Sequence, residues 1–512
     1  MRSSNTILLL RFLFVFTGLV AIFAATHASA APCVATDTAS LVAAIEGTSC
    51  ATVTLGNSIT LNGDLPAINR DLTIDGGGFT IDGDGAFQAL HVTAGNVAIN
   101  DLTVNDARAQ GGTGGGAGLG GGLFVGTGAA VIIDNVTLSN NEAVGGVGAS
   151  GGTGGSGSGG GLYVQSGATV TANGVLGITG NKALGGTGGS GGNGGQGDGG
   201  GIDVQSGGSF TSNAALTLLG NQALGGAGNL IGGNAFGGGV YNQSGNNLIA
   251  TNILTIQGNI AIGGTGNLIS GNASGGGVFN DGNLIMSPVV GLTQTIADEI
   301  AGNGSLTKAG LGNLISSAAN TYSGTTTVND GNLIASGNNA LGGGIVTVNA
   351  AGALDLNTTK QIIPGLDLGG ALGTTLAGTS AGQYGKVNVT GTATVAGELD
   401  LSLADGFKPA VGDMFDIMGF NVLSGNFTGV ALDGLGCGWT PSASGGIANC
   451  GGGLAFLLSD IPGSAADDFY QLEVTSAVPE PGTLALMASA FFMLFLTRRT
   501  LRAGQNLMGS KD

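Results

Sequence analysis

Short bursts of alternating apolar and polar residues run through most of the chain, separated by turns rich in glycine, asparagine and aspartate. In the segment GGGLYVQSGATVTANGVLGITGN the apolar side chains fall at every second position, at Leu162, Val164, Val170, Leu176 and Ile178. Alternation with a period of two is typical of β-strands that bury one face. Three short strands and three turns therefore predict one coil of a β-solenoid.

This pattern repeats in phase along the chain. A triple glycine followed by an apolar strand begins at Gly120, Gly159, Gly199, Gly237 and Gly275, at intervals of 39, 40, 38 and 38 residues. A second marker, an asparagine after a strand, occurs at Asn141, Asn181, Asn221 and Asn259. The chain lacks long glycine-free segments of helical period and has one tryptophan, so a β-solenoid is favoured over helical arrays and propellers.

In a solenoid the same position of successive coils stacks about 4.8 Å apart. One column is expected to point inward, and it contains Leu123, Leu162, Ile202, Val240 and Val278. Its neighbour is expected to point outward, and it contains Phe124, Tyr163, Asp203, Tyr241 and Phe279. We interpret the outward column as lateral packing rather than as an aromatic platform for sugars. The asparagine column is expected to occupy left-handed turn positions and to form hydrogen bonds along the axis.

Glycine-rich segments separate the asparagine marker from the next triple glycine. Residues 142–158 and 182–198 are dominated by Gly, Ser and Thr, a composition that predicts outward loops or disorder. In the next repeat the same place holds GNLIGGNAF, which has strand character. The sequence leaves open whether each repeat is one coil plus a loop or two coils.

Two stretches resemble known repeat families. The pairing of GGGLYV with ITGN is similar to the GGAI and FxxN repeats of polymorphic outer-membrane proteins and related right-handed parallel β-helices, over about residues 31–280. From residue 304 to 357, SLTKAGLGNLISSAANTYSGTTTVNDGNLIASG and its continuation resemble the autotransporter-associated β-strand repeat. The resemblance implies a right-handed parallel β-helix, with display at the cell surface as a corollary.

The first residues indicate export. Residues 1–30 form a predicted signal peptide, in which arginines flank an apolar run and Ala28 and Ala30 offer small residues for cleavage. The following TDTASLVAAIEG predicts a short amphipathic helix that covers the open first coil.

The four cysteines form two local groups, Cys33 with Cys50 and Cys437 with Cys450. An even number of cysteines in an exported chain predicts disulfides. Because short loops close most easily, the two local pairings are favoured over the other two connectivities.

The end of the chain resembles a sorting signal. VPEPGTLALMASAFFMLFLTRRTLR, residues 478–502, is similar to the PEP-CTERM signal of Gram-negative bacteria, in which a short motif precedes an apolar transmembrane helix and a basic cluster. The resemblance implies processing by an exosortase-type membrane enzyme and delivery to the surface of exopolysaccharide-making cells. An uncut single-span anchor is the alternative. The motif is Val478, Pro479, Glu480 and Pro481, and the basic anchor is Arg498, Arg499 and Arg502.

Composition limits the possible partners. Glycine accounts for 107 of 512 residues, and 31 acidic against 13 basic residues give a net charge of −18, which excludes nucleic acid as a partner. Without the signal peptide, His91 is the one remaining histidine, so no metal or other cofactor is predicted.

A cluster of acids in the first coils raises an enzymatic alternative, a polysaccharide lyase or hydrolase. A glycosidase needs two carboxylates at a set separation. Most of these acids stand beside turn-forming Gly or Asn, where aspartate is expected for its own backbone hydrogen bonds, so the turn interpretation is favoured. Convergence of the acids in one groove would distinguish the two. The acids are Asp75, Asp82, Asp84, Asp101 and Asp106.

Together these patterns predict an all-β protein, a right-handed parallel β-helix with an N-terminal helical cap, a C-terminal β module and a single C-terminal transmembrane helix. The predicted function is a non-enzymatic structural or adhesive component of the cell surface or exopolysaccharide matrix, with surface glycans as possible ligands. The predicted segments are 1–30 (signal peptide), 31–119 (cap and first coils), 120–300 (glycine-rich repeats), 301–378 (autotransporter-associated repeat), 379–477 (β module), 478–502 (sorting signal) and 503–512 (cytoplasmic tail).

Overall fold

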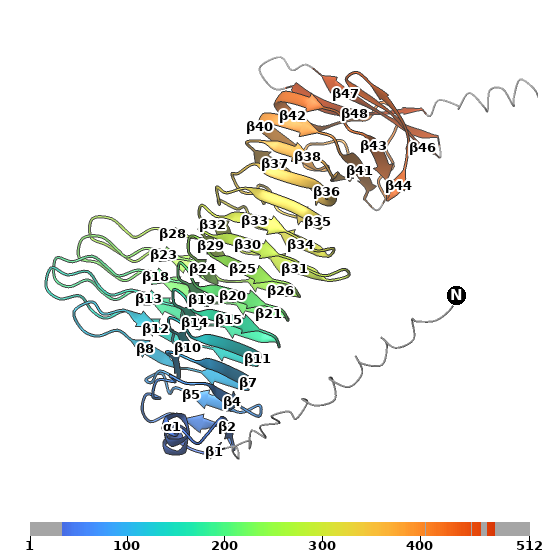
Figure 1. The fold of residues 1–512 in the computed structure, drawn as a ribbon. Helices are drawn as coiled ribbons and strands as arrows, with labels where there is room; N and C mark the ends of the chain where they lie inside the picture. The colour runs from blue at the N-terminus through green and yellow to red at the C-terminus, as the bar shows by residue number, and fades with distance from the viewer. Residues whose placement is uncertain (1–32, 405, 452, 462–467, 477–512) are drawn as a thin grey trace, which may run out of the picture.

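The computed structural model describes residues 33–404, 406–451, 453–461 and 468–476. These residues form an elongated stack of strands that ends in a C-terminal β module (Figure 1). Within the described residues the chain is all-β apart from the helix α1 (Thr38–Glu46), and no helix there is long and apolar enough to cross a membrane. The predicted signal peptide and sorting signal, with its transmembrane helix, lie outside the described residues.

Sheet A supplies two sides of every coil and is parallel from β1 through β43. It runs without a break through the predicted boundaries at residues 300 and 378. Its strands before residue 300 are β1 (Cys33–Ala35), β2 (Thr52–Leu55), β3 (Ile59–Thr60), β4 (Leu72–Asp75), β5 (Thr80–Asp82), β7 (Asn96–Asn105), β11 (Ala130–Ser139), β15 (Thr169–Ala172), β16 (Leu176–Thr179), β20 (Ser209–Ser212), β21 (Leu216–Leu219), β25 (Asn247–Ala250), β26 (Leu254–Gln257), β30 (Asn283–Met286) and β31 (Thr293–Ile296).

After residue 300 the parallel strands continue and then give way to antiparallel pairing. The parallel strands are β33 (Ser305–Lys308), β34 (Asn313–Ser316), β35 (Thr326–Ala335), β36 (Val346–Asp355), β37 (Lys360–Ile363), β38 (Leu366–Leu368), β39 (Ala371–Leu376), β40 (Lys386–Val395), β41 (Glu398–Leu403), β42 (Met414–Gly425) and β43 (Gly429–Leu432). The antiparallel strands, which pair with β42, β43 and one another, are β44 (Leu435–Gly436), β45 (Gly438–Ser442), β46 (Gly445–Gly451), β47 (Leu454–Ile461) and β48 (Asp468–Ser476).

Three smaller parallel sheets complete the glycine-rich repeats. Sheet B contains β6 (Leu90–Val92), β10 (Leu123–Val125), β14 (Leu162–Val164), β19 (Ile202–Val204), β24 (Val240–Asn242), β29 (Val278–Asn280) and β32 (Ile300–Ala301). Sheet C contains β8 (Arg108–Gln110), β12 (Glu142–Val144), β17 (Lys182–Leu184), β22 (Gln222–Leu224) and β27 (Ile260–Ile262). Sheet D contains β9 (Gly118–Leu119), β13 (Gly157–Ser158), β18 (Gly197–Asp198), β23 (Ala235–Phe236) and β28 (Ala273–Ser274).

The predicted inward column is confirmed. Leu162 of β14 pairs with Leu123 below it and Ile202 above it, and all three side chains are fully buried. Val240 and Val278 continue the column in the same register. Alternate residues of sheet A also face this interior, so the repeats share one continuous apolar core.

The outward column of sheet B packs laterally rather than facing solvent. The rings of Phe124 and Tyr163 stack with centroids 5.5 Å apart. Phe236 of sheet D packs on Phe279, with ring centroids 4.7 Å apart, so sheet D covers this face. The structure therefore agrees with lateral packing and leaves no exposed aromatic platform along this column.

The glycine-rich segments project outward (Figure 1), as one of the two expectations had it, and regular main-chain hydrogen bonds join them. Each repeat is one coil plus one arm, the arms being residues 111–119, 145–158, 185–198, 225–236 and 263–274. The arms project together from one side of the stack (Figure 1).

Main-chain hydrogen bonds hold each arm to the next. The amide of Gly146 donates to the Gly116 carbonyl at 2.7 Å and that of Gly186 to the Gly155 carbonyl at 2.8 Å, while Gly155 donates to Gly146 across the second arm itself. A Cβ at Gly155 would meet the Gly116 carbonyl oxygen, so the strands approach this closely only because the side chains are missing.

The asparagine column is a buried ladder. The Oδ1 atom of Asn181 accepts hydrogen bonds from the Asn141 amide and Nδ2 at 2.9 and 3.0 Å, and Asn181 makes the same two bonds to Asn221. The pattern continues to Asn259, which donates both bonds to the Asp298 carboxylate.

The conformational reason predicted for the asparagine column was wrong. The left-handed φ angles belong to the residues immediately before the four ladder positions, +55° at Asn140, +65° at Gly180, +64° at Gly220 and +69° at Gly258. The ladder asparagine is selected because a side-chain amide can satisfy buried main-chain groups of the adjacent coil.

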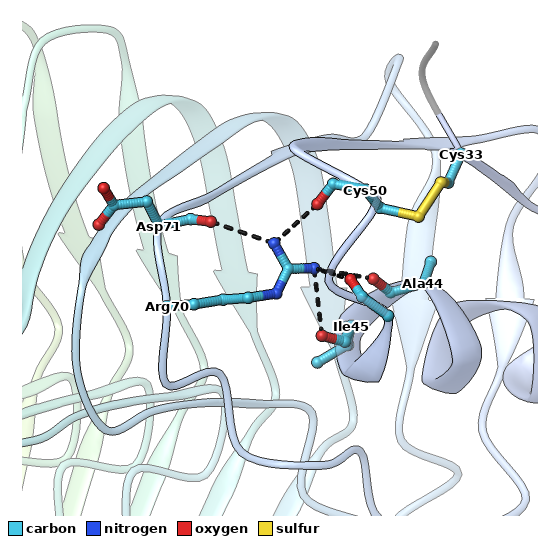
Figure 2. Close-up of a disulfide and its surroundings, with 7 residues drawn as sticks. Cys33, Ala44, Ile45, Cys50, Arg70 and Asp71 are labelled. Atoms are coloured by element: carbon cyan, nitrogen blue, oxygen red, sulfur yellow. Dashed lines mark hydrogen bonds between the residues drawn. A yellow bond between two sulfur atoms is a disulfide. The ribbon is translucent and has the colours of Figure 1, made fainter. Parts of the chain in front are cut away.

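The N-terminal end combines a helix, a disulfide and an arginine. α1 packs on β1 and β2 and buries Leu41 and Ile45, and Cys33 is bonded to Cys50 with Cα atoms 5.8 Å apart. Arg70 donates hydrogen bonds to the carbonyl oxygens of Ala44, Ile45 and Gly47 at the end of the helix, and to those of Cys50 and Asp71 (Figure 2). A cation at a helix C-terminus satisfies its free carbonyls and complements the helix dipole.

Asn181→Leu should lower the free energy of unfolding by about 2–3 kcal/mol, because the buried Asn141 amide loses its acceptor and the Leu138 carbonyl loses its donor. Chemical denaturation measures the change. The matched control is Ser190→Ala at an exposed arm tip, expected within about 0.5 kcal/mol of wild type. Equal losses in both variants would contradict the ladder's role.

Candidate functional site

The acids of the first coils lie at two separate corners. Asp75 ends β4, and its carboxylate accepts the Gly77 amide at 3.1 Å in the turn to β5; Asp101, within β7, lies in the next coil on that turn, where its carbonyl accepts the Gly78 amide. Asp82, Asp84 and Asp106 lie at the turn after β5, on the other side of that strand. Asp75 and Asp101 are therefore not brought together in one groove with Asp82 and Asp106.

Hydrogen bonding occupies the carboxylate of Asp82. One oxygen accepts the Asp84 amide and the other accepts Nδ2 of Asn105, both at 2.9 Å. Asp84, Asp101 and Asp106 have positive φ angles between 47° and 56°, conformations that aspartate tolerates at turns. Burial, with Asp82 and Glu142 nearby, raises the pKa of Asp106. These contacts support the turn interpretation.

The cations of this region are also engaged. Both terminal nitrogens of Arg70 donate to main-chain carbonyls, at the end of α1 and at Cys50 and Asp71, as described above. In sheet C, Arg108 lies 3.8 Å from the Glu142 carboxylate, and Lys182 of the next coil lies 3.3 Å from it. The described residues contain no group of three or more His, Cys, Asp or Glu side chains suited to hold a metal ion. A lyase-type constellation of base and metal-binding acids is not assembled in the part of the chain that the structure describes.

A recess of ≈ 340 Å³ lies between the first coils and the first arm. The ring of His91 lies 4.4 Å from that of Phe124, and partial burial lowers the pKa of His91. Gln88 donates from Nε2 to the carbonyls of Leu119 and Gly120, which fixes the end of the first arm on the coil below. The recess is lined by an aromatic ring, by the side-chain amides of Gln88 and Gln110, by the Arg108 guanidinium and by the Asp64 carboxylate.

The buried acid pair Asp198 and Asp203 was missed by sequence reasoning. Asp203 replaces an aromatic residue in the outward column and is fully buried, and Asp198 of the covering arm is 7% exposed. Each has one oxygen without a hydrogen-bond partner, and Tyr163 and Tyr241 lie in the rows on either side. Burial raises the pKa of Asp198 to about 7 and that of Asp203 well above its usual value, to which Asp198 also contributes. The available sequence signal for this pair was Asp203 itself, an acidic residue at a position where the other repeats have an aromatic residue.

The remaining predicted site residues take structural positions. The four ladder asparagines are almost fully buried and have both side-chain groups bonded, as described above. In the C-terminal module Cys437 is bonded to Cys450, with Cα atoms 4.3 Å apart. The signal cleavage residues Ala28 and Ala30 lie outside the described residues, as do the sorting motif and its arginines.

Comparison with known proteins gives two findings. A family model described as a putative pectate lyase-like adhesive domain matches residues 34–144. The chain is 41% identical over 87 residues to the adhesin BmaC autotransporter of Brucella suis biovar 1 (strain 1330). That alignment covers 17% of this chain and 2% of the adhesin's length. Both similarities are consistent with the parallel β-solenoid fold described above.

The buried acid pair should make stability depend on pH. Because the folded-state pKa values are raised above the unfolded value near 3.8, the contribution of these acids is fully present below that value. It is lost as pH rises through about 7, the pKa of Asp198. The wild type should therefore lose stability between pH 4 and 7 relative to an Asp198→Asn, Asp203→Asn variant, whose amides resemble the protonated acids. Parallel stability curves for the two proteins, measured by denaturation at each pH, would contradict the assignment.

Proposed function

We propose that this protein is an exported, non-enzymatic β-solenoid that serves as an adhesive or structural component of the cell surface or exopolysaccharide matrix. The observation that carries the proposal is the match of residues 34–144 to a model described as a putative pectate lyase-like adhesive domain. In these coils the carboxylates of Asp75 and Asp82 accept main-chain amides at turns. The engagement of Arg70 and Arg108 further supports an interpretation without catalysis.

The proposal includes a delivery route. The resemblance of residues 478–502 to a PEP-CTERM signal supports recognition by an exosortase-type membrane enzyme at Pro479, Glu480 and Pro481. The apolar segment would hold the chain in the membrane until processing, with Arg498 and Arg499 on the cytoplasmic side. In this proposal α1 acts as the cap of the first coil, the solenoid is right-handed, and the ligands are exopolysaccharide or other surface glycans.

Adhesion is tested on protein extracted from the cell surface. We expect it to bind exopolysaccharide from the producing cells, measured by co-sedimentation, and to release neither reducing ends nor unsaturated uronates. A variant with Asp75→Asn and Asp82→Asn should keep its binding if these acids serve turns. Turnover that this variant abolishes would overturn the proposal in favour of a lyase or hydrolase, and absence of binding to any surface polymer would remove the adhesive role.

Sorting is tested by intact-mass measurement of the surface-extracted protein, which should end near Pro479. Replacing Pro479, Glu480 and Pro481 by alanine should leave the full chain in the inner membrane. The control is Pro441→Ala, in strand β45 of the C-terminal module and away from the motif, which should be sorted normally. A wild-type protein that retains residues 484–512 and never reaches the surface would contradict the PEP-CTERM assignment.

A further inference from the structure

The first arm has no other arm beneath it. In a later repeat the covering arm places Phe236 over Tyr241 and Phe279 of sheet B. The coil below the first arm contains β4, β5 and β6, and it has no strand in sheet C or sheet D. The recess of ≈ 340 Å³ lies between that coil and the first arm, where the later repeats have another arm. Ala86 and Ala117, which line it, are exposed, so solvent reaches the recess.

Two rings form the apolar wall of the recess. His91 of β6 is the first residue of the outward column of sheet B, and Phe124 of the next coil pairs with it. Phe124 contacts the His91 ring on one side and stacks on Tyr163 on the other, so the rings hold one another in place. Burial lowers the pKa of the half-buried His91, and its ring is therefore uncharged at neutral pH. The recess offers a fixed, neutral aromatic surface at the end of the column.

Polar side chains on the other walls have unused hydrogen-bonding capacity. Asp64 accepts the Gln88 amide through Oδ1 at 2.8 Å, and its Oδ2 has no partner among the described residues. Gln88 donates from Nε2 to the main chain, which leaves its Oε1 oxygen free to accept. Gln110 holds Arg108 in place by accepting from its Nε and Nη2 at 3.2 and 2.8 Å, and Arg108 Nη1 lies 3.8 Å from the Glu142 carboxylate. The recess therefore presents free acceptors beside a positioned guanidinium.

A sugar ring matches this combination of groups. A pyranose has an apolar face of C–H groups, which packs on aromatic rings, and hydroxyls that both donate and accept hydrogen bonds. The volume is near the lower end of the ~300–1,000 Å³ typical of small-molecule sites, so it suits a single sugar residue rather than a length of polysaccharide.

Charge selects within this class of ligand. The one guanidinium that lines the recess already lies near the Glu142 carboxylate, and the Asp64 carboxylate lines the same space. An acidic sugar would therefore gain little from Arg108 and would be repelled by Asp64. A neutral sugar has hydroxyls that can donate to Asp64 and Gln88 without this repulsion.

We propose that this recess binds a single neutral pyranose residue of a surface glycan, with the sugar ring against His91 and its hydroxyls bonded to Asp64 and Gln88. The inference rests on the glycan-binding role proposed above and gives that role a defined place on the molecule. All residues that line the recess fall within residues 34–144, the segment that matches the adhesive domain model.

Titration with neutral methyl glycosides, those of glucose, galactose, mannose and N-acetylglucosamine, tests the recess directly. His91 is the one histidine that remains when the predicted signal peptide is removed, so its imidazole NMR resonances in the exported protein report on this place alone. At least one neutral glycoside should shift these resonances to saturation, and methyl glucuronide should bind about tenfold more weakly than that glycoside. No shift with any of the four, or a preference for the glucuronide, would overturn the proposal.

A blocking variant links the recess to the polymer. Ala117→Trp places a large ring where this exposed alanine lines the recess, and it should weaken glycoside and exopolysaccharide binding by about tenfold or more at an unchanged melting temperature. The matched control is Asn272→Trp, which changes the equivalent exposed position of the fifth arm and should bind like the wild type.

A second variant tests the polar wall. Asp64→Asn removes the charge but keeps an oxygen for the Gln88 amide, and it should weaken glycoside binding about threefold or more, because hydrogen bonds to a carboxylate are stronger than those to an amide. The control is Asp71→Asn, in which the carboxylate outside the recess accepts the Asn96 amide at 2.7 Å in the same way. Equal losses in the two variants would contradict a contact between Asp64 and the sugar.

The outcomes separate this inference from the adhesive role. If the wild type and Ala117→Trp bind exopolysaccharide equally well, the recess is not the binding site, and the adhesive role stands without it. If the wild type binds no surface polymer at all, both proposals fail.

Discussion

Main-chain hydrogen bonds between successive coils, at one constant spacing, are the constraint on which the rest of this structure depends. A side chain that pushes two coils apart at one position breaks the register at every other position of that coil. The inner column therefore repeats Leu, Ile and Val, and the arms are almost pure glycine where backbones from adjacent coils touch. At the corners the turn leaves a main-chain amide without a main-chain acceptor in the adjacent coil. The side-chain oxygen of that coil's ladder asparagine accepts this amide instead.

The solenoid could be predicted because apolar residues at every second position mark the buried face of a strand, and their repetition every 38–40 residues marks successive coils. Leu162 and Ile202 occupy the positions that the period assigns them. The arms were not predictable from composition, since glycine-rich sequence is also typical of flexible loops. The arms are regular because each one forms hydrogen bonds with the arms of adjacent repeats. The sequence signal for this was the nearly constant length of the repeats that contain them. The turn conformation was placed one residue too late because propensity does not distinguish Asn140 from Asn141.

The candidate site shows a second limit of sequence reasoning. The acids of the first coils attracted attention by their density, yet their carboxylates serve local turns. The sequence shows Asp203 within a column of mainly aromatic residues. Only the fold shows that Asp198 of the covering arm is buried close to it. Lys308 is similar, because its ammonium group is buried among the carbonyls of Ala309, Gly310 and Asp330. Asp75, Asp82 and Lys308 thus complete the hydrogen bonding of the backbone, whereas Asp198 and Asp203 each keep an oxygen without a partner.

The two disulfides would affect how the molecule responds to a pulling force. Hydrogen bonds between coils run along the solenoid axis, so tension along that axis would load them one coil at a time, beginning at the ends. Cys33–Cys50 closes the loop that contains α1, and Cys437–Cys450 closes the hairpin of β45 and β46 in the C-terminal module. A covalently closed loop cannot be drawn out, so the extension of these two segments is limited. A tethered protein built in this way would resist tension longest in these two segments and would yield first in segments without a cross-link.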